Sequence, residues 1–338
     1  MNNKYKRLSL SELCDRLLQF QRPVVVMHTR PDGDAIGSAY GLCGIFMAMG
    51  RDARCLCSDP IPKRLAFLNN EKLPCLEPET LSGYDYDGVI SVDIGAWGQI
   101  GSVAEDLSSG IDIMIDHHSK GEPFADYYIN KDAAAAGEII YDIACEFVRR
   151  GRMEKIDKLT AACIYAAISS DTGCFKYSNV TAKTHQIAAD LLALGVPFVE
   201  INRFLFDSKS RELLNAERIV YEKLRFYSGG SISICAIDNS IKRSNNLLDE
   251  HFSTAIDIAR SVEGVKISMV IREMDQNPGS FRVSMRANED IDVSDVCAHF
   301  GGGGHLRAAG CTIERDNIEE VILALLERMG VTSVVAEQ

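Results

Sequence analysis

The sequence of 338 residues lacks several features that would each indicate a particular class of protein. It has no Cys-x-x-Cys pair, and its eleven cysteines are scattered through apolar segments, which disfavours a cysteine-ligated zinc site. No apolar run is long enough to cross a bilayer, and no run of basic residues is present. The sequence also has no internal repeat and no low-complexity tract. These absences disfavour a membrane protein and a protein that holds a long nucleic acid.

The composition is that of an ordinary globular protein, with 46% hydrophobic and 25% charged residues. A chain of this length is expected to form two domains. Residues 1–7 are polar and basic, but an amphipathic stretch at 8–20 follows them instead of the apolar core of a signal peptide. We expect the cysteines to be reduced, small apolar residues of a cytoplasmic protein.

The formal net charge of −12 bears on the ligand. A protein that tracks a long nucleic acid usually has a basic face, and this chain is acidic. Two bound divalent cations would neutralise four carboxylates and make a local exception. The balance favours a small anionic ligand held in a cleft over a long polymer.

The segment His28-Thr29-Arg30-Pro31-Asp32-Gly33-Asp34 places one imidazole and two carboxylates in a short connection. It follows an apolar run at 24–27 that predicts a buried strand, and a helical pattern at 35–49 follows it. Asp32 and Asp34 alternate along an extended segment, so both carboxylates point the same way, and Gly33 adds no bulk between them. This ligand set suits Mn, Fe, Zn or Mg. The alternative is a helix N-cap with no metal.

Three later segments also end in acidic or imidazole side chains. The apolar strand at 89–92 ends in Asp93, the strand at 111–115 is followed by Asp116, His117 and His118, and the apolar stretch at 161–170 precedes Asp171. Because the carboxyl ends of parallel strands meet at one edge of a sheet, we expect these groups to converge. The combination favours a metal site over the N-cap alone.

The order of elements predicts an α/β protein. In the first part, strands at about 23–28, 53–57, 88–93 and 111–116 alternate with helices at about 34–50, 97–108, 133–150 and 157–170, which predicts a parallel sheet with helices on both faces. Helices at 181–194, 199–206 and 210–226 follow, and then strands at 232–237, 266–272 and 281–285 with helices near 248–262, 293–300 and 318–329. We expect a metal-binding domain at 1–195, a helical connection at 196–228 and a smaller α/β domain with a mixed sheet at 229–338.

At this point the sequence resembles the DHH phosphoesterases. The resemblance rests on His28-x-x-x-Asp32-x-Asp34, Asp93, Asp116-His117-His118 and Asp171, in that order, and on the glycine-rich run Phe300-Gly301-Gly302-Gly303-Gly304-His305 followed by Ala308-Ala309-Gly310. It covers about residues 20–330. It is nearest to the short bacterial and archaeal two-domain members, which include nano-RNase/pAp phosphatases and stand-alone cyclic-di-AMP or pApA phosphodiesterases.

The resemblance implies a site with two divalent ions. By this resemblance, one ion is bound by His28 and Asp32. The other is bound by Asp34, His117 and Asp171, and Asp93 bridges the two. It favours Mn, whereas the ligand types alone allow Mg, Fe or Zn. Asp116 would support an imidazole through a hydrogen bond, and His118 would donate a proton to the leaving oxygen or contact a phosphate. The alternative for His118 is a polar residue at the rim.

The resemblance also implies a substrate site in the second domain. Arg286 would bind a substrate phosphate, together with a loop of Gly302, Gly303, Gly304 and His305 whose N–H groups approach an anion. The alternative for the glycine run is a flexible loop that closes a hairpin, or a helix C-cap after Phe300. Leu306 and Arg307 depart from many relatives.

The implied function is a metal-dependent hydrolysis of phosphate esters in short nucleotides, such as short oligoribonucleotides to 5′-mononucleotides or pAp to AMP. Alternatives within the family are a cyclic-di-AMP or pApA phosphodiesterase, an inorganic pyrophosphatase or exopolyphosphatase, and a single-strand exonuclease. A different class is a nucleotide-binding regulator without turnover, which would have lost a metal ligand. We expect short oligonucleotides or small nucleotides as partners, neither long duplex DNA nor a membrane, and a homodimer is compatible with the sequence.

Overall fold

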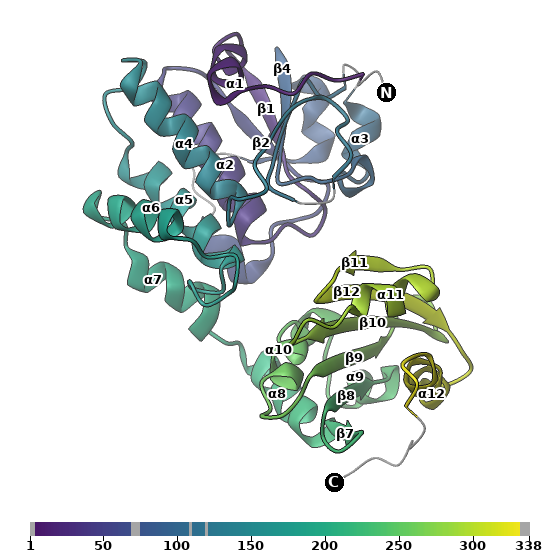
Figure 1. Cartoon of the computed structure of the whole chain (residues 1–338). Coiled ribbons are helices and arrows are strands. Elements are labelled where there is room, and N and C mark those ends of the chain that lie inside the picture. Colours follow the sequence, from purple (N-terminus) through teal and green to yellow (C-terminus); the bar gives the residue numbers. More distant parts are fainter. Residues whose placement is uncertain (1–3, 69–74, 108–109, 119–120, 332–338) are drawn as a thin grey trace. The chain divides into compact units, whose positions relative to one another are not determined.

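The computed structural model describes residues 4–68, 75–107, 110–118 and 121–331, and it divides into two compact units, Met1–Ser208 and Lys209–Gln338 (Figure 1). The helices that the sequence analysis placed in a connection at 196–228 fall into both units. The first unit ends with α7 (Phe198–Asn202) and a π-helical turn, η4 (Arg203–Asp207). The second unit begins with α8 (Arg211–Lys223).

The first unit is built on a parallel sheet of six strands in the order β3-β2-β1-β4-β5-β6. The predicted strands are present as β1 (Pro23–Val26), β2 (Arg54–Leu56), β4 (Gly88–Val92) and β5 (Ile113–Asp116). The edge strands β3 (Cys75–Leu76) and β6 (Asp126–Ile129) were not predicted, because they are short and only half-buried. The predicted parallel sheet is confirmed.

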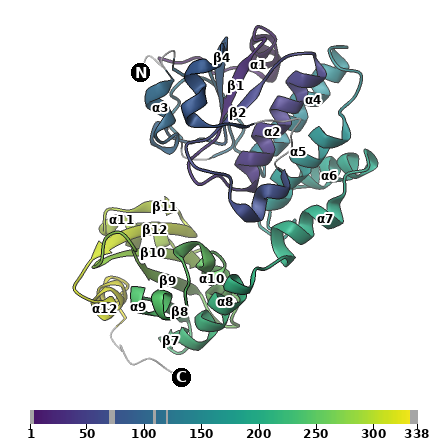
Figure 2. The same ribbon diagram turned by 180° about the vertical axis from the view of Figure 1, so that it is seen from behind.

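Both faces of this sheet are covered, which explains why its central strands are continuous apolar runs. Val25 and Ile90 face the larger core, formed with α1 (Leu10–Leu17), α2 (Gly33–Ala48), α4 (Ala136–Arg149), α5 (Lys158–Asp171) and α6 (Ala182–Ala193). Val24 and Val89 face a smaller core under the short turns η2 (Pro78–Gly83), η3 (Trp97–Gln99) and α3 (Val103–Asp106). Figure 2 shows α2, α4 and α5 side by side on one face.

The chain changes direction across the sheet between β1 and β4. The crossover after β1 runs through α2 on the face of the larger core, and the one after β4 runs through α3 on the other face. The two connections therefore diverge at the carboxyl ends of β1 and β4. In open α/β sheets, ligands bind at such a switch point.

Glycines bring α2 and α5 into close contact. A methyl group placed on Gly37 would lie 2.5 Å from the carbonyl oxygen of Cys163 and 2.8 Å from the backbone nitrogen of Ala167, so no side chain fits there. At Gly33 it would lie 2.4 Å from the hydroxyl of Ser170. These contacts fix the end of α5, and with it Asp171, against the start of α2.

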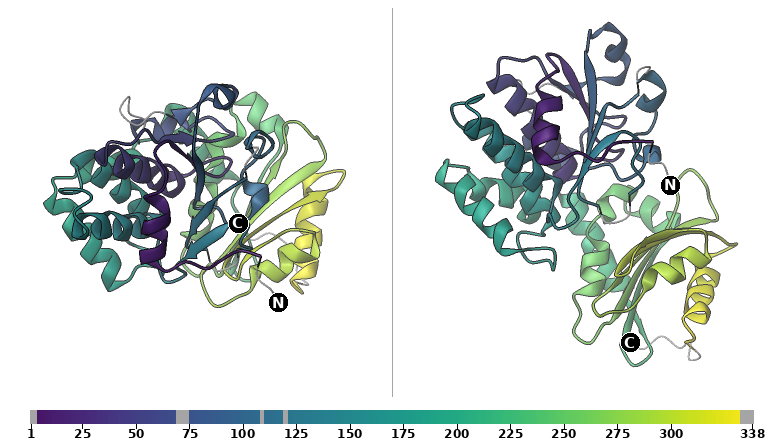
Figure 3. Two further views of the ribbon diagram at one scale, coloured as in Figure 1. Left: turned by 90° about the horizontal axis from the view of Figure 1, so that it is seen from above. Right: turned by 45° about the horizontal axis from the view of Figure 1, so that its top comes forward.

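The second unit contains a mixed sheet of six strands in the order β11-β12-β10-β9-β8-β7, in which only β8 and β9 run parallel. The strands are β7 (Arg225–Tyr227), β8 (Ile232–Ile237), β9 (Ile267–Glu273), β10 (Ser280–Ala287), β11 (Gly303–His305) and β12 (Ala308–Glu314). One core lies under α11 (Val293–His299) and α12 (Ile318–Arg328), and another under α8 and α10 (Ala255–Arg260). Figure 3 shows helices on both faces of this sheet. The predicted smaller α/β domain with a mixed sheet is confirmed, but the sequence analysis predicted only β8, β9 and β10 and missed β7, β11 and β12.

Two predicted helices are broken in the structure. The one predicted at 97–108 consists of η3 and α3, separated at Gly101, whose φ of +78° ends the turn, and its last residue lies outside the described part of the chain. The one predicted near 248–262 consists of the turn η5 (Asp249–Phe252) and α10, and the short helix α9 (Asn239–Ser244) precedes them. Among the described residues, no helix combines the length and apolar character that a bilayer span requires.

We expect Gly37→Ala to destabilise the first unit by about 1–3 kcal/mol, because the added methyl group meets the backbone of α5. The direction of this change is informative, because replacing Gly with Ala inside an uncrowded helix normally raises the free energy of unfolding. Urea unfolding followed by circular dichroism measures the change. Gly83→Ala, where the added group meets nothing within 4 Å, is the matched control. A Gly37→Ala variant as stable as the parent would contradict this account of the α2–α5 contact.

Candidate metal centre

The carboxyl edge of the first sheet brings the predicted side chains together. His28 follows β1, Asp93 follows β4 directly, and His117 follows β5. Asp171 reaches the same place as the last residue of α5. Together with Asp32 and Asp34 at the start of α2, these residues form two groups whose potential ligand atoms lie within 4.8 Å of one another.

The first group is His28, Asp32 and Asp93. His28 Nε2 lies 3.6 Å from Asp93 Oδ2 and 3.9 Å from Asp32 Oδ1. Asp32 is also the N-cap of α2, because its Oδ1 accepts hydrogen bonds from the N–H groups of Asp34 and Ala35, each at 3.0 Å. Both interpretations of Asp32 therefore describe the same side chain, which caps the helix and faces the cluster.

The second group is Asp34, His117 and Asp171. His117 Nε2 lies 3.7 Å from Asp34 Oδ2 and 3.6 Å from Asp171 Oδ2. It also lies 3.5 Å from Asp93 Oδ1, so Asp93 faces both groups. Two ligand atoms that each lie about 2.0–2.2 Å from an ion are roughly 3–4 Å apart, and the distances of both groups match this spacing.

The two imidazoles are turned so that Nε2 faces the carboxylates. His28 Nδ1 donates a hydrogen bond to the carbonyl oxygen of Thr29 at 2.8 Å, and His117 Nδ1 donates one to the carbonyl oxygen of Ala133 at 3.2 Å. Because a carbonyl oxygen can only accept, Nδ1 carries a proton in both rings. This arrangement leaves Nε2 for a metal ion and fixes the ring orientation.

Asp93 is the most constrained member of the cluster. Its side chain is buried, its backbone adopts a left-handed conformation with φ of +57°, and its Oδ1 has no hydrogen-bond partner among the described residues. A buried carboxylate oxygen without a donor is costly unless a cation balances it. The donor set and this orphaned oxygen therefore fit divalent cations.

The pKa values of the side chains in the cluster also indicate that it favours bound positive charge. Burial opposes the charge on Asp93, but the nearby imidazoles of His117 and His28 outweigh it and hold its pKa at about 2. Burial also opposes protonation of the imidazoles, yet the surrounding carboxylates, Asp93 first, raise the pKa of His28 to about 9 and of His117 to about 10. Burial and nearby carboxylates raise the pKa of Asp171 to about 6. The cluster attracts positive charge, and ions would displace protons from it.

Asp34 is held by contacts that the sequence analysis did not identify. Its Oδ2 accepts from the N–H of Ala136 at 2.7 Å, and its Oδ1 accepts from the N–H of Gly137 at 3.0 Å and from the hydroxyl of Ser38 at 2.9 Å. The N–H groups belong to the first turn of α4, where the helix dipole favours a negative charge. The only sequence signal for this contact is the run of small residues before α4.

Asp116 and His118 form a hydrogen-bonded pair beside the cluster. His118 Nδ1 lies 2.7 Å from Asp116 Oδ1, which also accepts from the N–H of His117 at 2.8 Å. The hydrogen bond that His118 donates to Asp116 outweighs burial and raises the pKa of His118. His118 Nδ1 is also 3.6 Å from Asp93 Oδ1, so His118 lies against the cluster as well as against Asp116.

The predicted substrate residues lie in the second unit. Arg286 in β10 pairs with Ala308 in β12, and Ala308 pairs with His305 in β11, so the three backbone positions form one row across the sheet. The side chain of Arg286 is half-buried, and one of its N–H groups donates to the carbonyl oxygen of Met285 at 2.9 Å. The side chain of His305 lies outside what the structure describes.

The glycine run forms a β-hairpin rather than an open loop. Gly303 and Gly304 pair with β12, and β11 is the edge strand of the sheet. A methyl group on Gly302 would lie 2.2 Å from the carbonyl oxygen of Gly310, and one on Gly304 would lie 2.4 Å from that of Ala308. Two of these glycines therefore have a packing role, and an edge strand still presents outward N–H groups.

Comparisons with known proteins match both units to known domains. The DHH family, N-terminal domain, matches residues 22–168, and the DHHA1 domain matches residues 239–330. The chain is 27% identical to a probable bifunctional oligoribonuclease and PAP phosphatase NrnA of Streptococcus mutans, over 90% of this chain and 94% of the relative. It is 24% identical to the bifunctional oligoribonuclease and PAP phosphatase NrnA of Bacillus subtilis, over 94% of this chain and 98% of the relative.

Two further comparisons concern a longer relative and a solved structure. A cyclic-di-AMP phosphodiesterase GdpP of Geobacillus thermodenitrificans is 22% identical over 93% of this chain, which spans 48% of that protein. The crystal structure of an exopolyphosphatase-related protein from Bacteroides fragilis has a TM-score of 0.85 at 22% identity and covers 95% of both chains. At this identity the structural likeness supports the fold alone.

We expect Asp93→Ala to lower the metal content, because Asp93 faces both groups of ligands. Protein incubated with Mn²⁺ and passed through a desalting column should retain up to two ions per chain in the parent and fewer in the variant, measured by elemental analysis. Asp85→Ala, which removes an exposed carboxylate of the same unit, is the control and should retain the parental content. An Asp93→Ala variant that folds and keeps all of its Mn²⁺ would contradict the assignment.

Proposed function

This chain belongs to the DHH family, with a DHH N-terminal domain and a DHHA1 domain, and we propose that it hydrolyses phosphate esters in short nucleotides with two divalent cations. The substrates are short oligoribonucleotides, cleaved to 5′-mononucleotides, and pAp, cleaved to AMP. The names of the NrnA relatives, which align over nearly the whole chain, support this substrate class. The eleven free cysteines are consistent with an enzyme of the reducing cytoplasm.

The observation that carries the proposal is the position of Asp93 between two sets of ligands. His28 and Asp32 would hold one ion, Asp34, His117 and Asp171 would hold the other, and Asp93 would contact both. A pair of bound cations lowers the pKa of a water molecule and stabilises the charge of an in-line displacement at phosphorus. Carboxylate and imidazole ligands suit Mn²⁺, which the resemblance also favours.

The residues of the chain supply positioning and a proton. Thr29 and Ala133 fix the rings of His28 and His117 through their carbonyl oxygens. Asp116 orients His118 and favours its protonated form, so His118 can hold a proton at Nε2 and donate it to the leaving oxygen. In this proposal His118 is a catalytic residue, and Asp116 is a positioning residue.

The acidic charge of the chain favours short substrates. With a formal net charge of −12, each further phosphate outside the site adds repulsion, which salt partly screens. In the second unit, Arg286 and the outward edge of β11 are the groups we assign to a substrate phosphate. A cyclic-di-AMP or pApA phosphodiesterase is the second candidate, supported by the similarity to the Geobacillus enzyme.

We expect hydrolysis rates to fall steeply once an RNA exceeds a handful of nucleotides. Initial rates with Mn²⁺ on labelled RNA of two to about twenty nucleotides test this, because the longest exceed the footprint of a compact site. The same panel includes pAp, pApA, cyclic-di-AMP and pyrophosphate, with mononucleotide, orthophosphate and pyrophosphate as measured products. Asp93→Ala prepared in parallel controls for contaminating nucleases. Rates that are equal or rise with length would contradict the proposal and indicate a processive exonuclease.

We expect Asp116→Asn to lower kcat about 10- to 100-fold at unchanged metal content. The amide oxygen of Asn still accepts the backbone N–H groups, but the lost charge lowers the pKa of His118. The protonated donor is then lost at a lower pH, so the alkaline limb of the pH–rate profile shifts to lower pH. Asp85→Asn serves as the control. A normal profile in Asp116→Asn would show that the Asp116–His118 pair does not supply the proton.

A further inference from the structure

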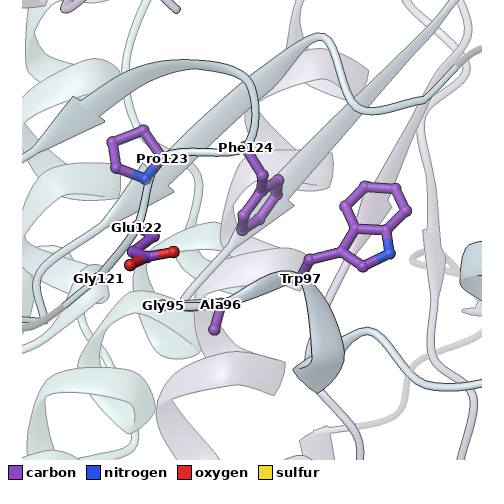
Figure 4. A pocket seen from close by; sticks show the side chains of 7 residues that line it. All are labelled: Gly95, Ala96, Trp97, Gly121, Glu122, Pro123 and Phe124. Atoms are coloured by element: carbon purple, nitrogen blue, oxygen red, sulfur yellow. The ribbon is translucent and has the colours of Figure 1, made fainter. Parts of the chain in front are cut away.

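A pocket that the catalytic proposal does not use lies in the first unit. It has a volume of about 480 Å³, within the size range of small-molecule sites, and is lined by Gly95, Ala96, Trp97, Gly121, Glu122, Pro123 and Phe124 (Figure 4). These residues come from the segment after β4 and from the segment that leads into β6.

The pocket adjoins the candidate metal centre. Gly95 is the second residue after Asp93, and a methyl group placed on it would lie 3.6 Å from the Cβ of His118. One placed on Gly121 would lie 3.5 Å from Asp116 Oδ2. The backbone of both pocket segments therefore lies directly against the side chains of His118 and Asp116.

The two segments that form the pocket are held in place by hydrogen bonds. The side-chain oxygen of Gln99 accepts from the N–H groups of Gly95 and Ala96 at 2.8 and 2.9 Å. The N–H of Glu122 donates to the carbonyl oxygen of Gly95 at 3.1 Å, which joins one segment to the other. A site that is formed before binding loses less entropy when a ligand enters.

An exposed aromatic ring forms one wall. Trp97, the single tryptophan of the chain, is 43% exposed, and its ring meets that of Phe124 edge to face, with 5.7 Å between the ring centres and 77° between the planes. Phe124 is half-buried against the smaller core and anchors the pair. The edge-to-face contact with Phe124 covers only part of the indole ring of Trp97, and the rest of the ring is open to a ligand.

The charge of the lining indicates which part of a nucleotide fits. Among the described lining residues there is no lysine or arginine, and Glu122 is the one ionisable side chain. A phosphate would be repelled by this carboxylate, whereas an uncharged aromatic ring is not. Stacking on an aromatic side chain tolerates every base, because each base has a π-face.

We propose that Trp97, supported by Phe124, stacks the base of the nucleotide whose phosphate is hydrolysed. This inference rests on the proposed function and deepens it, since it assigns the base to the first unit beside the metal centre.

Fluorescence tests the pocket without turnover. Because Trp97 is the single tryptophan, the tryptophan emission of the protein reports on this pocket alone. We expect AMP, added in the presence of Mn²⁺, to quench the emission in a saturable way, and ribose 5-phosphate, which has the phosphate and sugar but no base, to leave it unchanged. An equal response to both compounds, or no response to AMP, would overturn the inference.

Kinetics provide the second test. Trp97→Ala should raise KM for a dinucleotide about 5- to 150-fold, and Trp97→Phe, which keeps a ring, should recover most of the loss. Tyr221→Ala, which removes an exposed aromatic side chain of the second unit, should behave like the parent. A folded Trp97→Ala enzyme with parental KM would refute base stacking. If the parent protein hydrolyses no nucleotide, the proposed function fails, and the fluorescence result still decides on the pocket.

Discussion

The structure of the first unit depends on the crowding of four carboxylates at one edge of a sheet. Asp34 and Asp93 are buried there, and among like charges each would be unfavourable without compensation. The compensation visible in the chain is partial: two imidazoles, and for Asp34 the first turn of α4. Divalent cations would supply the remaining positive charge, so the crowding that is unfavourable by itself is also the feature that would favour metal binding.

The rest of the unit serves to keep this cluster in place. The switch point of the sheet brings the ends of β1 and β4 together, and Asp93 takes a left-handed backbone conformation directly after β4. Gly37 allows α5 to approach α2, which delivers Asp171 opposite Asp34. Backbone carbonyls, rather than further acidic side chains, orient the two ligand imidazoles. The groups that orient these two imidazoles therefore do not themselves titrate.

The two short segments that follow β4 and β5 carry different chemistry on their two sides. On one side, Asp93, Asp116 and His118 face the cluster. On the other, Trp97 and Phe124 form an aromatic wall, and the described residues that line this pocket include no lysine or arginine. Ionisable and aromatic side chains therefore lie within a few residues of each other, on loops that a sheet holds, which is where functional residues are commonly found.

The sequence by itself determined the central strands, the convergence of His28, Asp32, Asp34, Asp93, His117 and Asp171, and the class of sheet in each unit, because apolar runs and the residues that end them are local signals. Only the tertiary structure decided the hairpin of Gly303 and Gly304, the edge strands β3 and β6, and the contact of α4 with Asp34. It also decided the pairing of Trp97 with Phe124. The hairpin is local, but a glycine run does not by itself distinguish it from an open loop. The other features depend on backbone groups and side chains that meet across long stretches of chain, and no local pattern records such contacts.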